Sequence, residues 1–140
     1  YQVGCELWSA TSYKALREQA IEVERWNRLH PEQQQRQPLV TELLDGGTGP
    51  IVAVSDFMRI VPEQVARFVP SRSFTPLGTD GMGRSDTRTA LRRHFEIDAQ
   101  HLVVAVLFEL AKTGQIKSEV VSEAIKRHGI DPEIAFSLHQ

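Results

Sequence analysis

The sequence of 140 residues contains a single cysteine, Cys5. One thiol excludes an internal disulfide and any zinc site built from several cysteines, and it is typical of a reducing compartment. No apolar run approaches the roughly 20 residues that span a bilayer, and residues 1–10 lack the basic start and long apolar core of a signal peptide. We therefore expect no membrane segment and a cytoplasmic location.

The sequence also lacks a charge excess of either sign. Lys and Arg number 16 and Asp and Glu number 18, which gives a net charge of −2. This balance excludes the basic footprint of a nucleic-acid-binding domain and an acidic tail. The length fits one domain, which can hold a core without a disulfide or metal. The missing initiator methionine leads us to expect a piece of a longer protein.

Three short segments are typical of β-strands. Residues 3–10 are mostly apolar between polar flanks. Residues 51–54 form a continuous apolar run after a turn, which indicates a strand buried on both faces, as in a parallel sheet. Residues 74–77 include Pro76, which favours the edge of a sheet or the end of a strand.

Helical spacing of apolar residues alternates with these strands. It predicts helices near residues 13–26, 39–44, 61–68, 87–95, 101–113 and 118–128. The expected N-caps are Ser85 or Asp86, Asp98 and Ser118, and Gly114 and Gly129 are expected to end helices. The helix at 101–113 is apolar on almost every side, which predicts burial between layers. The alternation predicts an α/β domain with a mostly parallel sheet.

A glycine-rich loop at residues 77–86 is the best candidate for a site, because it joins a strand to a helix where ligands bind in open α/β sheets. Its order G-x-x-G-x-G matches neither the dinucleotide-binding motif nor the P-loop. Met82 occupies a position where a calcium loop needs an oxygen ligand. Arg84 near a helix start would suit an anion, whereas the simpler interpretation is a tight turn that requires glycine.

The remaining polar residues show no catalytic arrangement. The five histidines are scattered, and no two have the i, i+4 spacing of a helical metal site. His128 is expected to cap a helix end. Cys5 is expected to be a small buried hydrophobe, and Trp8, Trp26 and Phe108 are expected to pack in the core or at an interface.

Two longer strings are more specific. Residues 24–31 read ERWNRLHP, and residues 77–88 read LGTDGMGRSDTR and continue into LRRHFEID at 91–98. With SDFM at 55–58 and the helix at 103–112, they resemble the C-terminal domain of the homodimeric pyruvate dehydrogenase family over nearly the whole chain. Met82 stands where that family has an aromatic residue, which is a conservative apolar exchange.

The resemblance implies that residues 1–140 form a three-layer transketolase C-terminal-like domain. Its mostly parallel mixed sheet would lack the family's first strand and helix. The implied parent enzyme is an oxidoreductase that decarboxylates pyruvate on thiamine diphosphate with magnesium and acetylates a lipoyl group. Other domains of the family hold those cofactors, so the resemblance implies no catalytic, cofactor or metal residue here and an inactive isolated segment.

The implied partners are the rest of the same enzyme, a second subunit in a homodimer, and the dihydrolipoyl acetyltransferase component. Asp80, Arg84, Asp86 and Arg88 would contact a subunit or an anion from the loop at 78–86. Because the missing strand is internal in the family's sheet, we expect a partner chain or a swapped arrangement to supply it. Two alternatives stay open, namely an independent phosphate- or nucleotide-binding module using this loop, and an enzyme with another substrate, such as a 2-oxoglutarate dehydrogenase.

Overall fold

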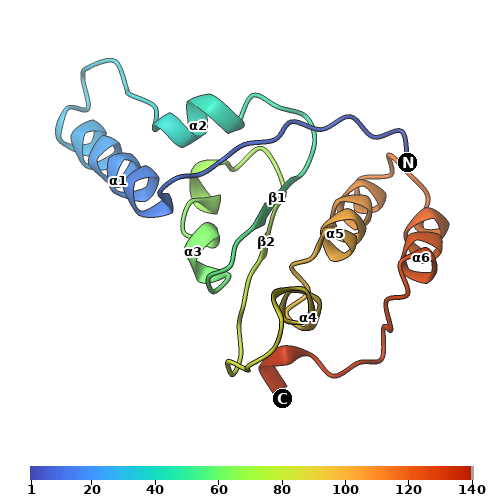
Figure 1. Cartoon of the computed structure of the whole chain (residues 1–140). Helices are drawn as coiled ribbons and strands as arrows, with labels where there is room; N and C mark the ends of the chain where they lie inside the picture. The colour runs from blue at the N-terminus through green and yellow to red at the C-terminus, as the bar shows by residue number, and fades with distance from the viewer. Residues whose placement is uncertain (140) are drawn as a thin grey trace.

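The computed structural model describes residues 1–139 as helices on both sides of a two-stranded sheet (Figure 1). Helices α1, α2 and α3 lie on one side, and α4, α5 and α6 lie on the other. The elements are α1 (Tyr13–Leu29), α2 (Leu39–Leu44), β1 (Ile51–Val54), α3 (Ile60–Glu63), η1 (Ala66–Phe68), β2 (Phe74–Leu77), α4 (Arg88–His94), α5 (Ala99–Lys112), α6 (Ser118–Arg127) and η2 (Ser137–His139). The predicted α/β class is confirmed, although the described sheet is small and purely parallel. No helix among the described residues is long and apolar enough to cross a membrane.

The sheet has two edges that differ in their ability to bind another strand. Strands β1 and β2 run parallel, with Ile51 opposite Phe74 and Ala53 opposite Pro76. The Ile51 amide donates to the carbonyl of Ser73, directly before β2, at 2.8 Å, and the Ser55 amide donates to the carbonyl of Leu77 at 3.0 Å. Alternate residues of a strand face one neighbour, so Val52 and Val54 present their backbone groups to the outer edge of β1. The outer edge of β2 carries Pro76, which has no N–H to donate.

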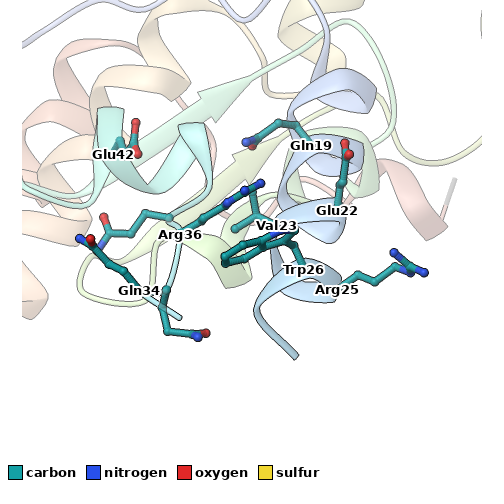
Figure 2. A pocket seen from close by; sticks show the side chains of 10 residues that line it. Gln19, Glu22, Val23, Arg25, Trp26, Gln34, Arg36 and Glu42 are labelled. Atoms are coloured by element: carbon teal, nitrogen blue, oxygen red, sulfur yellow. The ribbon is translucent and has the colours of Figure 1, made fainter. Parts of the chain in front are cut away.

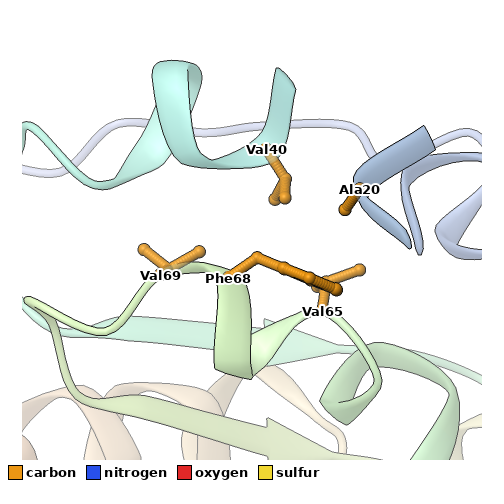
Figure 3. Packing of buried hydrophobic residues seen from close by; sticks show 5 residues of the cluster. All are labelled: Ala20, Val40, Val65, Phe68 and Val69. Atoms are coloured by element: carbon orange, nitrogen blue, oxygen red, sulfur yellow. The ribbon is translucent and has the colours of Figure 1, made fainter. Parts of the chain in front are cut away.

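Two hydrophobic clusters lie one on each side of the sheet. The first contains the buried side chains Ala20, Val40, Val65, Phe68 and Val69, which join α1 and α2 to the segment between α3 and β2 (Figure 3). The second joins α5 to α6 through Leu107, Val121 and Ala124. Residues 51–54 are less buried than predicted, since Ala53 is buried but Val54 is 42% exposed. The small sheet leaves the end of β1 uncovered.

The predicted strand at residues 3–10 is wrong in this structure. Residues 1–12 form no helix or strand, and all of them are exposed. A strand requires backbone bonds to a neighbouring strand, and within the described part of the chain residues 3–10 pair with no strand. Cys5 is exposed rather than buried, and Trp8 lies outside the core with 58% exposure.

The helix ends were predicted with mixed success. Asp98 caps α5 by accepting a bond from the His101 amide, and Gly114 and Gly129 have positive φ after α5 and α6. The N-cap of α4 is Thr87, not Ser85 or Asp86, because its hydroxyl reaches the Ala90 amide. Ser118 is the first residue of α6, and the capping position belongs to Lys117. Helix α5 is also less enclosed than predicted, since Phe108 is 53% exposed.

Candidate functional site at the carboxyl ends of the strands

The glycine-rich loop packs directly against the loop that follows β1. A Cβ at buried Gly78 would lie 2.5 Å from the carbonyl oxygen of Phe57 and 2.6 Å from the amide nitrogen of Arg59. Thr79 stabilises the same contact, because its amide donates to Phe57 O at 2.9 Å and its hydroxyl donates to Asp56 O at 3.0 Å. Glycine at position 78 is therefore explained by a close approach of two backbones.

Asp80 lies inside this contact between the loop after β1 and the glycine-rich loop, which we call the joint. It is 9% exposed, and its carboxylate lies 3.2 Å from both the amide nitrogen and Nε of Arg59. The amide makes a hydrogen bond, whereas Nε is oriented too poorly to make one, so the ion pair is held by charge. The Arg59 guanidinium also lies 4.7 Å from the centre of the Phe136 ring. Sequence reasoning missed this pair because its members are 21 residues apart.

The C-terminal turn η2 closes the joint from the other side. Buried Ser137 donates through its hydroxyl to the carbonyl of Asp80 at 3.0 Å. Gly81 has a φ of +102°, and a Cβ there would lie 2.3 Å from the carbonyl oxygen of Ser137. Figure 1 shows the C-terminal end beside the loop after β2. The first half of the glycine-rich loop is thus used for packing.

The other three predicted site residues lie at the surface. Arg84 contacts His94 at 3.2 Å from Nη1 to Nδ1, and Asp86 accepts the Thr87 amide at 2.8 Å. Arg88 is exposed at the start of α4. The structure therefore separates Asp80 from Arg84, Asp86 and Arg88. Contact of these residues with an anion or another subunit stays a prediction.

A polar groove of about 830 Å³ lies elsewhere, between α1, residues 34–37 and α2 (Figure 2). Its central aromatic residue is Trp26, whose ring stacks on His30 at 4.4 Å and carries the Arg36 guanidinium at 3.6 Å. Asn27 exchanges two hydrogen bonds of 2.9 Å with the Arg36 backbone. These contacts use the ring to hold the loop, so this part of the ERWNRLHP string has a structural explanation.

Comparison with known proteins decides the family. Residues 1–98 match the model of the transketolase-like TK C-terminal domain. The chain belongs to this family. It is 47% identical over 133 residues to the pyruvate dehydrogenase E1 component of Pseudomonas aeruginosa and 44% identical to that of Escherichia coli K12, in each case over 95% of this chain. The counterpart from Mycolicibacterium smegmatis is 43% identical over 131 residues. The chain spans about 15% of the length of these relatives.

Within this transketolase-like domain, one buried carboxylate links the sheet to α5. Glu109 is 4% exposed and lies 3.1 Å from Lys112 Nζ. Burial opposes ionisation of Glu109, but hydrogen bonds from Lys112, Thr75 and Ser73 outweigh that effect and hold its pKa below the usual value. The carboxylate therefore stabilises the contact between α5 and β2.

A second carboxylate joins three helices. Burial opposes ionisation of Asp98, but the His101 amide at 2.8 Å, the His101 ring at 2.7 Å and Arg93 at 3.3 Å lower its pKa. Arg93 also donates to the carbonyls of His128 and Gly129 at 3.2 and 2.6 Å. The role of His128 at a helix end agrees with the prediction, since it is the C-cap of α6.

The described residues do not form a metal centre. Within residues 1–139, no three His, Cys, Asp or Glu side chains lie together in a way that would hold a metal ion. The carboxylates of Asp80, Asp98 and Glu109 are paired with arginine or lysine, and Asp80 and Asp98 also accept backbone amides. These carboxylates are already engaged, so no step of cofactor chemistry is assigned to them.

Proposed function

We propose that this domain is a structural and subunit-contacting part of a pyruvate dehydrogenase. The parent enzyme would be a cytoplasmic oxidoreductase that decarboxylates pyruvate on thiamine diphosphate and acetylates a lipoyl group. The main support is the 47% identity over 95% of the chain with a pyruvate dehydrogenase E1 component. The geometry supports a non-catalytic role, because the strings at residues 24–31 and 77–88 serve to join loops and helices rather than to gather reactive groups.

A chimera tests this function directly. The matching 133-residue region of the Pseudomonas aeruginosa E1 component would be replaced by this chain, and pyruvate-dependent acetylation of a lipoyl domain would be measured. We expect activity within about tenfold of the parent. A chimera carrying the matching Escherichia coli region is the control for the junctions. The proposal fails if that control is active and the chimera with this chain is folded but inactive.

The open edge of β1 supports the further proposal that the domain is incomplete at its N-terminal side. An isolated two-stranded sheet is marginal, and an unpaired edge invites another strand. Pro76 blocks growth at β2, whereas Val52 and Val54 leave β1 open. We propose that a strand from the rest of the enzyme or from a second subunit pairs with this edge.

The substitution Val52→Pro tests the edge, because it removes an outward N–H and leaves the bonds to β2 in place. We expect little change in the thermal unfolding of the isolated chain. In the chimera we expect a loss of about 1 kcal/mol, the value of one hydrogen bond. Ala53→Pro is the control that should destabilise both forms, since it breaks the β1–β2 pairing. Equal effects of Val52→Pro in both forms would contradict strand addition.

A further inference from the structure

A group of exposed apolar side chains surrounds the joint at the carboxyl ends of the strands. Phe57, Met58 and Ile60 follow β1 and are 68%, 56% and 59% exposed, and Met82 in the glycine-rich loop is 77% exposed. Leu138 in the C-terminal turn is 54% exposed. We call these five residues the carboxyl-end patch.

The backbone contacts of the joint place the patch residues near one another. Thr79 bonds the carbonyl of Phe57, and Gly81 lies against the carbonyl of Ser137, the residue before Leu138. Three separate segments thus present apolar side chains at one end of the domain. Clustered exposure of this kind marks an interaction site, whereas single exposed hydrophobes are ordinary.

The charges beside the patch indicate the chemistry of its partner. Arg84 has the imidazole of His94 as its contact, and no carboxylate within residues 1–139 lies within ion-pair distance of Arg84 or Arg88. Arg59 and Arg92 are already paired with Asp80 and Asp56. A partner that brings an apolar centre and carboxylates at its edge would therefore be complementary.

We propose that the carboxyl-end patch docks onto such an apolar, acid-rimmed protein surface in the remainder of the enzyme. The inference rests on the proposed function and names the face that makes the contact. A protein surface fits better than an anionic membrane, because Asp56 directly precedes Phe57 of the patch and the chain carries a net charge of −2. A second copy fits less well, because it would bring further arginines to the same region.

Trypsin cleavage after Arg84 tests the docking. Arg84 is exposed in the isolated chain, so this bond should be cut readily there and at least tenfold more slowly in the chimera, as followed by mass spectrometry. Met82→Asp should restore cleavage in the chimera and leave the unfolding temperature of the isolated chain unchanged. The matched control is Leu29→Asp, which alters a similarly exposed residue (55%) at the end of α1 and should leave Arg84 protected.

The outcomes separate this inference from the proposed function. An active chimera with an unprotected Arg84 overturns the docking and leaves the function standing, whereas an inactive chimera with a protected Arg84 does the reverse. An inactive and unprotected chimera overturns both. If Arg84 is protected in the isolated chain and Met82→Asp abolishes that protection, the patch binds a second copy. If the chain binds phosphatidylglycerol vesicles, the patch binds a membrane. Either result overturns the chosen partner.

Discussion

The substitution Gly78→Ala is expected to destabilise the domain by about 2–3 kcal/mol, at the upper end of the cost of overpacking a well-filled site. The added methyl group would lie 2.5 Å from the carbonyl oxygen of Phe57 and 2.6 Å from the amide nitrogen of Arg59. Both atoms belong to the backbone and cannot move aside as a flexible side chain can. Urea unfolding followed by circular dichroism measures the loss.

The matched control is Gly83→Ala, five residues further along the same loop. A Cβ at Gly83 meets no atom within 4 Å, and its φ is not in the left-handed region. We expect its stability to change by less than about 0.5 kcal/mol, as at ordinary surface positions. If both variants lose the same stability, the close approach of the two loops is not what requires glycine at position 78.

The substitution Glu109→Ala is expected to cost about 2–3 kcal/mol, because it removes the charged acceptor of several hydrogen bonds, and a bond to a charged group contributes about 1.5–3 kcal/mol. Its partners are Ser73 and Thr75 near β2 and the half-exposed Lys112. Glu123→Ala removes an exposed carboxylate from α6 and should change stability little. Comparable losses in the two variants would contradict a special role for Glu109.

The pH dependence of the same site follows from its lowered pKa. A carboxylate with a lower pKa in the folded state stabilises the fold above the ordinary glutamate value of about 4.3 and loses that contribution as pH falls through the folded value. The stability difference between the wild type and Glu109→Gln should therefore shrink on acidification from about pH 6 to about pH 3. Asp98 titrates in both proteins, so its effect cancels in the difference. A difference that is constant or grows over this range would overturn the assignment.

Local signals in the sequence were sufficient for most elements. Apolar spacing predicted α1 and α5, and Asp98 and Gly114 were recognised as the boundaries of α5 because caps act over three or four residues. The prediction for residues 3–10 failed because a strand depends on a neighbour, and no local pattern shows whether the neighbour is present. Whether Asp86 or Thr87 caps α4 depends on the residue at which the helical backbone begins. Both side chains can act as caps, so the loop sequence alone does not decide between them.

The candidate site was predicted in place but only partly in role. The glycine-rich loop was correctly placed at the end of the second described strand. The predicted need for unusual backbone angles holds at Gly81, whose φ is +102°, whereas Gly78 is explained by a close approach of two backbones. Asp80 was grouped with Arg84 as a candidate contact for a subunit or an anion, whereas in the structure it pairs with Arg59 and its carbonyl accepts the Ser137 hydroxyl. Those partners lie 21 and 57 residues away in the sequence. Long-range contacts of this kind leave no periodic signal in a single sequence.

The bond between Ser137 and Asp80 also bears on the order in which the chain folds during synthesis. Chains fold from the N-terminus as they leave the ribosome, and the residues of η2 emerge after those of every other element that the structure describes. The two hydrophobic clusters can form earlier, since Ala124 is the latest buried residue that either contains. The glycine-rich loop can reach its final conformation only after translation reaches η2, so the surface that carries Met82 matures later than the two hydrophobic clusters.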